Sequence, residues 1–440
     1  MSDSSINKSL LEKINCKTAD VGVIGLGYVG LPLAVELAKA GYRTVGLDVQ
    51  KEKVEMVNYG DNYIDDVDPD DLKNMVASGK LTATCDFESV KELDCVIICV
   101  PTPLDEYYQP DISHIINASE QISKYMHRDM LIILESTTYP GTTEDVVRPI
   151  LEKSGLKCGT DFYLAFSPER IDPGNKLYKT KNTPKVVGGV TSVCTDAAAL
   201  LYGNVLEGGI YKVSSPKVAE MEKIHENTFR NVNIALVNEM AIICDKMGID
   251  VWEVIEAAKT KPYGFMPFYP GSGVGGHCIA VDPFYLTWKT REYGYHTKLI
   301  ETAGEINNSM PEFVLARTMK ILNRFGKALR GSKILVLGAA YKPDINDTRE
   351  SPALKVIDLL VKNGADVMYN DPCVQQFCYK GREYHSVQLS AEILEEADLV
   401  LIATAHSSYD YDFIQSYSRY IFDTKNAMKN VKKRNNIEKL

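Results

Sequence analysis

Cys278 is the residue of this chain whose neighbours most suggest covalent chemistry. It lies in the segment PGSGVGGHCIAVDPFYL, residues 270–286, after a run of glycines and four positions before Asp282. A thiolate is a strong nucleophile, and a carboxylate close to it can take or give a proton. The alternative is a tight structural turn that holds an inert cysteine, because most cysteines of a reducing compartment pack as small apolar side chains.

Three polar residues follow one face of a long helix that is predicted over residues 215–247. Lys223, Asn227 and Asn231 are spaced four apart, so their side chains share one side of the helix. Such a face could belong to a functional site. A solvated polar stripe is the competing interpretation, and it fits Lys223 taken alone.

The N-terminal segment has the pattern of a dinucleotide-binding unit. Gly25, Gly27 and Gly30 form G-x-G-x-x-G between a short buried strand and a helix that runs to Ala40. The first glycine permits a tight turn, the second lets the backbone approach a pyrophosphate, and the third allows helix and strand to pack closely. The amide groups at the helix N-terminus then face the phosphates.

Asp48 ends the next predicted strand and bears on the choice of cofactor. A carboxylate at this position accepts hydrogen bonds from the ribose hydroxyls and repels a 2′-phosphate. No arginine follows it in VQKEK, so NAD is favoured over NADP, with Lys51 as the one observation on the other side.

Several later strands of the N-terminal half end in polar turns. In open α/β sheets, ligands bind beyond the carboxyl ends of the strands, which makes these turns candidates for a site. They are Pro101–Pro103, Ser136–Thr138 and Ser167–Glu169. Serine and threonine are also ordinary helix caps, so each turn alone fits a plain connection, and Glu169 is the residue least explained in that way.

The last third returns to strands and helices, after a second helical region over about 290–325, and it lacks a glycine fingerprint. The chain is therefore predicted to be an α/β protein with two Rossmann-like doubly wound domains joined by a long central helical region. The expected boundaries are 1–212 for the NAD-binding domain, 213–328 for the central helical domain and 329–440 for the C-terminal domain.

Composition excludes several classes of function. The chain has 440 residues and a formal charge of −10, which argues against nucleic acid or an anionic membrane as a general partner. No apolar run reaches the ~20 residues that span a bilayer, and the polar N-terminus lacks the apolar centre of a signal peptide, so a cytoplasmic protein is expected. The ten cysteines are scattered without a C-x-x-C pair, and no metal site is predicted.

A set of ordered motifs carries a resemblance to a known family. GLGYVG, STTYPGTT, SPERIDPG, the K-x-x-x-N helix, GVGGHCIAVDPFYL and AYKPDINDTRESP occur in that order. The chain resembles the UDP-glucose/GDP-mannose dehydrogenase superfamily over essentially its whole length. Within it, the chain is most similar to the UDP-N-acetylhexosamine 6-dehydrogenases. UDP-N-acetylglucosamine is the favoured substrate, and UDP-N-acetylmannosamine, UDP-glucose and GDP-mannose are the alternatives.

The resemblance implies a two-step, four-electron oxidation of a sugar C6 alcohol to a carboxylate, with NAD as the acceptor. Lys223, Asn227 and Asp282 would steady the alkoxide of the first step. Cys278 would then add to the aldehyde as a thiohemiacetal, and loss of a hydride would give a thioester. The residues implied for hydrolysis of that thioester by water are Thr137, Glu169 and Asp282.

The resemblance also implies which residues bind the two ligands. Those for the cofactor are Gly25, Gly27, Tyr28, Val29, Gly30, Asp48, Pro101, Thr102, Ser136, Thr137 and Arg349. Those for the UDP-sugar are Glu169, Arg170, Lys223, Asn227, Tyr269, Gly271, Gly275 and Lys342. The glycines before Cys278 would let backbone amides approach the sugar nucleotide. The family further implies at least a homodimer through the long central helix, and a role in supplying polysaccharide precursors.

Two positions depart from UDP-glucose dehydrogenases. Pro173 stands where those enzymes commonly carry a second glutamate, four residues after the one that matches Glu169. Either Glu169 works without it, or Asp172 takes part. His277 stands where serine or tyrosine is usual, and it either tunes Cys278 or fills space. Both departures fit the N-acetylhexosamine branch.

Two other classes of function compete with this interpretation. A one-step alcohol dehydrogenase of the hydroxyacid type shares a nucleotide domain and long helices, but it needs neither a cysteine nor a third domain. A non-catalytic protein that binds NAD or a nucleotide sugar would require decay of the reactive residues. Lys223, Asn227, Cys278 and Asp282 are all present.

Overall fold

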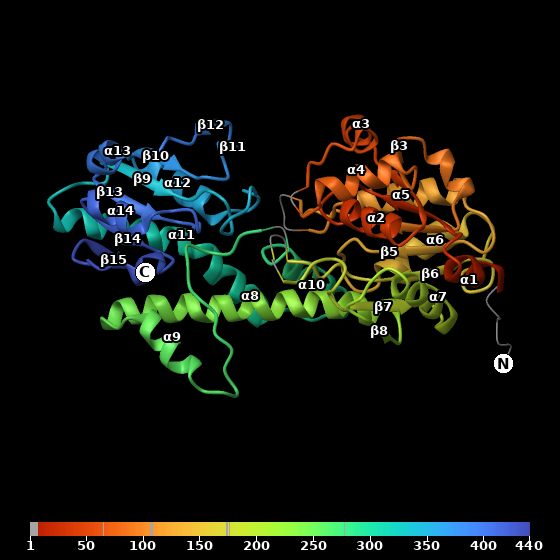
Figure 1. Ribbon diagram of the computed structural model, residues 1–440. Helices are drawn as coiled ribbons and strands as arrows, with labels where there is room; N and C mark the ends of the chain where they lie inside the picture. Colours follow the sequence, from red (N-terminus) through yellow and green to blue (C-terminus); the bar gives the residue numbers. More distant parts are fainter. Residues whose placement is uncertain (1–7, 65, 106–108, 173–174, 176, 277) are drawn as a thin grey trace. The chain divides into compact units, whose positions relative to one another are not determined.

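The computed structural model describes residues 8–64, 66–105, 109–172, 175, 177–276 and 278–440. Pro173 and His277, the two positions that depart from UDP-glucose dehydrogenases, lie outside these residues. The chain forms two compact units, residues up to Glu226 together with Phe284–Tyr295, and Asn227–Pro283 together with His296–Leu440. Each unit contains a mainly parallel sheet with helices packed on it (Figure 1).

The first unit is built on an eight-stranded sheet in the order β3-β2-β1-β4-β5-β6-β7-β8. Its strands are β1 (Asp20–Ile24), β2 (Arg43–Leu47), β3 (Leu81–Thr84), β4 (Cys95–Ile98), β5 (Leu131–Leu134), β6 (Tyr163–Phe166), β7 (Lys185–Gly189) and β8 (Ile210–Val213). All neighbours run parallel except β6 and β7. The first six strands have the Rossmann order, in which ligands bind beside β1, where the order reverses.

Helices cover both faces of this sheet, which explains why its central strands are apolar runs without alternation. One face packs against side chains of α2 and α7, and the other against α5 and α6. The helices are α1 (Lys8–Asn15), α2 (Gly30–Lys39), α3 (Lys51–Tyr59), α4 (Pro69–Ala77), α5 (Ser113–Tyr125), α6 (Arg148–Glu152) and α7 (Ser192–Gly203), with a 3₁₀ turn at Phe87–Glu92 and a π-helical turn at Thr142–Val147.

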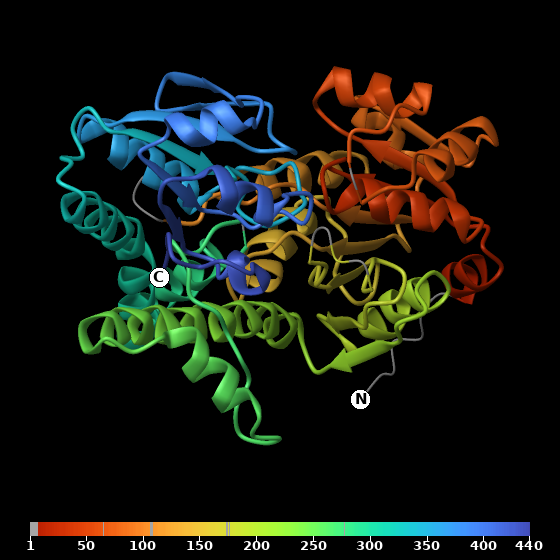
Figure 2. The ribbon, with the colours of Figure 1, turned by 60° about the vertical axis from the view of Figure 1, so that its left-hand side comes forward.

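Long helices follow the first sheet. α8 (Pro216–Met247) matches the predicted helix, and Gly248 stands just beyond it with a φ of +71°. α9 (Val251–Lys259) follows α8 and lies beside its C-terminal end (Figure 1 and Figure 2). Its apolar side chains form one buried cluster with those of the last turns of α8. Among the described residues, no helix is both long and apolar enough to cross a membrane.

The predicted second helical region over 290–325 is wrong at its start. α10 (Asp282–Thr290) runs into a 3₁₀ turn (Arg291–Tyr293), and Gly294 follows with a φ of +68°. That left-handed residue breaks the helix. α11 therefore begins only at Lys298 and runs to Arg324.

The second unit contains a five-stranded parallel sheet in the order β10-β9-β13-β14-β15. The elements are β9 (Lys333–Leu337), α12 (Pro352–Lys362), β10 (Asp366–Asn370), the hairpin β11 (Gln376–Tyr379) and β12 (Arg382–His385), α13 (Ala391–Glu396), β13 (Leu399–Ile402), α14 (Tyr411–Tyr417), β14 (Ile421–Asp423), a 3₁₀ turn (Ala427–Asn430) and β15 (Ile437–Lys439). The order reverses between β9 and β13, as in other doubly wound sheets. The predicted α/β fold, with two parallel sheets and long central helices, is confirmed.

Candidate active site

The turn after β1 is shaped for a ligand by its three glycines. Gly25 has a φ of +93°, and a Cβ there would lie 2.6 Å from the carbonyl oxygen of Cys99. A Cβ at Gly30 would overlap the carbonyl of Gly25, so the third glycine is needed for α2 to pack on the strand. Beside Gly27, by contrast, no described atom lies within 4 Å of the position of a Cβ. The open space thus lies at the glycine that is predicted to face a pyrophosphate.

Asp48 is buried at the carboxyl end of β2 and holds this turn. Its Oδ2 accepts a hydrogen bond from the amide of Leu26, and its Oδ1 accepts one from the amide of Gln50, both at 2.9 Å. A carboxylate has about four acceptor positions. Asp48 therefore keeps acceptor capacity for ribose hydroxyls while it fixes the glycine turn, and the residues of this cradle fit NAD.

The loops after β4 and β5 are tied to each other at the same edge of the sheet. The Thr102 hydroxyl donates to the carbonyl of Thr137 at 2.7 Å, and the Ser136 hydroxyl donates to the carbonyl of Val100 at 2.7 Å. Tyr285, from the segment of α10 that belongs to the same unit, donates its hydroxyl to the carbonyl of Thr102. Hydrogen bonds thus join the loops that carry the predicted cofactor residues Thr102, Ser136 and Thr137.

Glu169 is held by a buried ion-pair network that the sequence did not reveal. Its Oε2 accepts from the Lys185 ammonium at 3.0 Å, and its Oε1 accepts from the amides of Arg170 and Ile171 at 2.7 and 2.8 Å. Lys185 also pairs with Glu135, which is 1% exposed. Burial alone would raise the pKa of Glu169, but the Lys185 ammonium outweighs it and holds that pKa below its usual range. Glu169 is therefore an ionised carboxylate with a fixed orientation.

Arg170, a predicted substrate ligand, is engaged by two carboxylates of α8. Its guanidinium pairs with Glu226, and Nε lies 3.5 Å from Glu222. A substrate phosphate would have to share this guanidinium with both glutamates.

Lys223 lies on the same helix and differs from Arg170. It is only 6% exposed, and it makes no hydrogen bond or ion pair with any residue that the structure describes. A buried ammonium without such a partner is costly unless a ligand supplies the negative charge. Lys223 therefore fits the predicted role better than a solvated stripe does.

Glu220, one turn before Lys223, anchors the loop that follows β5. It is fully buried, and it accepts hydrogen bonds from the amide of Gly141 at 2.5 Å and from the amide and hydroxyl of Thr143 at 2.8 and 2.7 Å. Burial raises the pKa of Glu220 to about 7. The sequence offered no signal for this residue, because a glutamate in a helix is ordinarily a surface charge.

Cys278 is exposed, so the interpretation of a buried, inert thiol is wrong for this cysteine. Its carbonyl accepts the amide of Asp282 at 2.8 Å, which fixes it at the start of α10. Asp282 is 1% exposed, and its Oδ2 accepts from the Asn227 side-chain amide at 2.5 Å. The structure thus brings together three of the predicted catalytic residues in the second unit.

A chain of asparagines positions the loop that carries Cys278. Asn231 donates to the carbonyl of Ile279 at 3.0 Å, and Asn307 of α11 donates to the carbonyl of Asn231 at 3.1 Å. Asn238 donates to Asn307 at 2.9 Å and accepts from the amide of Gly271 at 3.0 Å. Asn238 and Asn307 were missed. Their only sequence signal is a polar residue within a helix, which is ordinarily exposed.

The glycines before Cys278 pack against their own chain. A Cβ at Gly275 would lie 2.7 Å from Cβ of Tyr341, and a Cβ at Gly276 would lie 2.8 Å from the ring of Tyr341. Gly273 and Gly276 also have φ values of +128° and +85°. The sequence suggested that these glycines admit a sugar nucleotide, whereas the structure gives a packing reason for them.

The other predicted ligands of the second unit are polar and accessible. The guanidinium of Arg349 pairs with Asp347 at 2.7 Å, and Tyr269 donates its hydroxyl to Glu256 at 2.7 Å. Lys342 is half-buried. Lys425 was missed: its ammonium faces the position of a Cβ on Gly271, makes no ion pair with a described residue, and has its pKa lowered to about 8 by burial.

Three domain models of one family match most of the chain. They are the NAD binding domain, over residues 19–206, the central domain, over 217–309, and the UDP binding domain, over 335–430, of the UDP-glucose/GDP-mannose dehydrogenase family. The chain belongs to this family. It is an NAD-binding nucleotide-sugar 6-dehydrogenase, and the predicted cofactor and enzyme class are confirmed.

Relatives of this dehydrogenase align over nearly the whole chain. A UDP-N-acetyl-D-glucosamine 6-dehydrogenase of Pseudomonas aeruginosa is 38% identical over 89% of this chain and 92% of its own. A UDP-N-acetyl-D-mannosamine dehydrogenase of Campylobacter jejuni is 37% identical over 88% and 96%. The solved structure of the UDP-D-ManNAc dehydrogenase from Pyrococcus horikoshii superposes with a TM-score of 0.86 at 35% identity, over 96% of this chain and 98% of that one.

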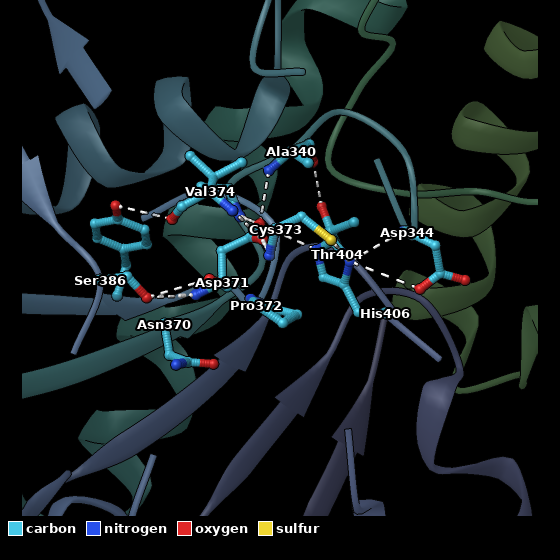
Figure 3. Close-up of polar contacts among 12 residues, drawn as sticks. Ala340, Asp344, Asn370, Asp371, Pro372, Cys373, Val374, Ser386, Thr404 and His406 are labelled. Carbon is cyan, nitrogen blue, oxygen red and sulfur yellow. Dashed lines mark hydrogen bonds and ion pairs between the residues drawn. The ribbon is translucent and has the colours of Figure 1, made fainter. Parts of the chain in front are cut away.

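The second sheet of the dehydrogenase carries a group of potential metal ligands, Asp371, Cys373 and His406 (Figure 3). His406 is buried between two partners. Its Nε2 lies 3.0 Å from Oδ2 of Asp371, and its Nδ1 accepts the amide of Asp344 at 3.0 Å. Both ring nitrogens therefore take part in hydrogen bonds. These bonds join the loops after β9, β10 and β13, which gives the group a structural role without a metal.

Proposed function

We propose that this enzyme oxidises the C6 alcohol of a UDP-N-acetylhexosamine to the carboxylate in two steps, with Cys278 as the covalent nucleophile. The N-acetylhexosamine assignment is supported by the relatives, whose named substrates are UDP-N-acetylglucosamine and UDP-N-acetylmannosamine. We favour UDP-N-acetylglucosamine. UDP-N-acetylmannosamine, UDP-glucose and GDP-mannose are the alternatives that a substrate panel must separate.

The observation that carries the proposal is the cluster at the start of α10. An exposed thiol, Cys278, precedes a buried carboxylate, Asp282, which is hydrogen-bonded to Asn227. A one-step alcohol dehydrogenase has no need of such a nucleophile. A binding protein has no need of a reactive thiol beside a buried acid.

In the first oxidation, protein groups take the alcohol proton and stabilise the alkoxide. Lys223 is suited to stabilise the alkoxide because it is a buried cation that makes no hydrogen bond or ion pair with a described residue, while the carboxylates of Glu222 and Glu226 attract it at longer range. Charge stabilisation of this kind is strongest where water is excluded. Asp282 and Asn227 supply a carboxylate and an amide whose orientation is fixed by their mutual hydrogen bond. NAD supplies the hydride acceptor for each of the two oxidations when it is bound.

In the second oxidation, the Cys278 sulfur adds to the aldehyde carbon, so that a C–S bond forms and the carbonyl oxygen takes a proton. Loss of a hydride from that carbon, together with the hydroxyl proton, leaves a thioester. Water then attacks the thioester carbon, the C–S bond breaks, and Cys278 is regenerated. Glu169 is the proposed base for this water, because it is ionised and held by Lys185.

Charged and glycine positions of the second unit are proposed to bind the sugar nucleotide. Lys342 and Lys425 would face its phosphates, with Gly271 beside Lys425. Lys425 is the stronger case, since burial lowers its pKa more than the attraction of Asp423 raises it, and a diphosphate would supply the missing negative charge.

A homodimer through α8 is also proposed. Apolar side chains are exposed along this helix in the single chain, with Phe229, Leu236 and Ile243 at seven-residue spacing. Exposed apolar stripes of this kind mark helix–helix interfaces. Sedimentation of the wild type beside a Leu236→Glu variant tests it, and a wild-type monomer would overturn it.

The function is tested by the number of NADH molecules formed per sugar, across a panel of UDP- and GDP-linked hexoses and N-acetylhexosamines. We expect two NADH per UDP-N-acetylhexosamine consumed, with a uronic acid as product. One NADH per sugar would indicate a simple alcohol dehydrogenase. None, with binding retained, would indicate a binding protein.

A further inference from the structure

Strand β7 runs antiparallel to β6, and this direction places a lysine at the ligand edge of the six parallel strands β1 to β6. β6 and β7 pair as Ala165 with Gly189 and Phe166 with Gly188. Continuing that register places Lys185, the first residue of β7, opposite Glu169, which follows β6. A β7 parallel to β6 would put its first residue at the other edge, so the reversed direction of β7, which β8 shares, creates this contact.

Lys185 is the centre of a buried cluster at that edge. Its ammonium pairs with Glu135, which follows β5, and with Glu169 at 3.0 Å. Tyr202 of α7 donates its hydroxyl to the other oxygen of Glu135 at 2.7 Å, and its ring lies 5.3 Å from the ammonium. Lys185, Glu135 and Tyr202 are at most 4% exposed. Two carboxylates therefore share one cation where water has little access.

We propose that Lys185, fixed by Glu135 and Tyr202, is the positioning residue that keeps Glu169 ionised and aimed for hydrolysis of the thioester. This rests on the proposed function, because it assigns Glu169 to that step. It also offers a substitute for the second glutamate that UDP-glucose dehydrogenases carry where this chain has Pro173. The second carboxylate of the cluster is Glu135, which comes from a different strand.

The electrostatics of the cluster support this division of roles. Burial raises the pKa of Glu135 to about 7, while Lys185 holds the pKa of Glu169 below its usual range. These opposite directions favour Glu169 over Glu135 as the carboxylate that stays ionised. Without the ammonium, burial would dominate and the pKa of Glu169 would rise.

The sign of the expected pH effect follows from these directions. A base acts in its ionised form, so a raised pKa removes activity at the acidic end. In Lys185→Met, kcat should fall as the pH is lowered through the raised pKa of Glu169, over a range where the wild type keeps more of its rate. At pH 6 we expect a loss of roughly ten- to a hundred-fold, within the range of one general base. The KM values for NAD and UDP-sugar should change less than about twofold.

Two further variants and one control allow the proposal to be tested even if Lys185→Met folds poorly. Lys185→Arg retains the cation and should restore most of the pH profile. Glu135→Gln has the shape of the protonated glutamate and leaves the ammonium to Glu169, so its acidic limb should stay in place or move to lower pH. Tyr42→Phe removes another buried hydroxyl of the same unit, which donates to the carbonyl of Ile14, and it should leave the profile unchanged.

The measurements are kcat against pH and rapid-quench mass spectrometry of the whole enzyme during turnover. We expect an acylated Cys278 to accumulate in Lys185→Met, because hydrolysis becomes the slow step. An equal loss of rate at every pH, without that adduct, would show a merely structural lysine and overturn the inference. A wild type that forms one NADH per sugar would instead overturn the proposed function, so the two failures are distinguishable.

Discussion

In both mainly parallel sheets of this dehydrogenase, the turn after the central strand has the same backbone arrangement. Gly25 follows β1 with a φ of +93°, and Gly338 follows β9 with a φ of +88°. Each glycine donates its amide to the last residue of the neighbouring strand, Leu47 at 2.7 Å and Asn370 at 2.8 Å. In both units the residue directly after that neighbouring strand is an aspartate, Asp48 or Asp371, whose carboxylate accepts hydrogen bonds from backbone amides of the turn.

The two aspartates differ in how many hydrogen bonds they accept from described residues. Asp48 accepts two. Asp371 is within hydrogen-bond distance of five donors, which are the amides of Ala339, Ala340, Cys373 and Val374 and the ring of His406. A carboxylate offers about four acceptor positions, so Asp371 is saturated by its own chain while Asp48 can still accept from a ribose. The same arrangement of glycine turn and aspartate suits a dinucleotide only where the aspartate can accept further hydrogen bonds and where the turn leaves room for a pyrophosphate.

The proposed nucleophile, Cys278, belongs to neither sheet. Its substitution should cause the largest loss of activity. Cys278→Ser should lower steady-state acid formation by at least a thousandfold, because a serine hydroxyl is a far weaker nucleophile than a thiolate. NAD and UDP-sugar should still bind, as measured by calorimetry. Cys378→Ser alters another exposed cysteine, on β11, and serves as the control. Near-normal turnover of Cys278→Ser would contradict the covalent mechanism.

The open space at Gly27 is what distinguishes the first turn from the second, where Ala340 is buried at the equivalent position. Gly27→Val should weaken NAD binding by roughly a hundredfold or more, because its side chain would occupy the place of the pyrophosphate. The melting temperature of the enzyme without NAD should change little, since no described atom lies there. Unchanged NAD affinity would show that the cofactor does not approach this glycine.

The saturated aspartate should matter more for stability than for binding. Asp371→Ala leaves several buried donors without a partner and should lower the free energy of unfolding by about 3 kcal/mol. Asp48→Ala removes fewer bonds and should cost about 1–2 kcal/mol. Urea unfolding of both variants, followed by a probe in each unit, measures the difference. Equal losses would mean that the two aspartates do the same structural work.

The smallest effect concerns cofactor choice. Asp48→Ala removes the carboxylate that repels a 2′-phosphate, so the preference for NAD over NADP should relax by about tenfold in kcat/KM. Asp371→Ala should leave that preference unchanged, because its carboxylate is committed to the second sheet. An unaltered preference in Asp48→Ala would remove this aspartate from cofactor selection.

The cofactor half of the site was predictable because its determinants are local. Gly25, Gly27, Gly30 and Asp48 lie within 24 residues, and the strand–turn–helix geometry that they require follows from steric rules and backbone hydrogen bonds. Asn227 and Asp282 were also predicted as site residues, and the structure joins them by a hydrogen bond although 55 residues separate them. In that case the information came from a family resemblance rather than from a physical pattern.

The positioning residues were not predictable in this way. Glu135 and Lys185 lie next to apolar strands and look like ordinary strand ends, and Glu220 and Asn238 look like helix surface. The glycines at 273, 275 and 276 have a packing reason only once Tyr341 and Pro352 are placed beside them.

The sequence by itself determined the fold class, the cofactor and the family, and it singled out Cys278 as the candidate nucleophile, because each depends on residue types at short and fixed spacing. The tertiary structure alone decided which charges are buried together. The reversal of β7 brought Lys185 to Glu169, and the packing of α8 placed Glu220 under the loop after β5. Strand direction and long-range packing depend on the whole chain. The pKa of a buried group depends on neighbours that are far away in the sequence, so a local sequence pattern cannot predict it.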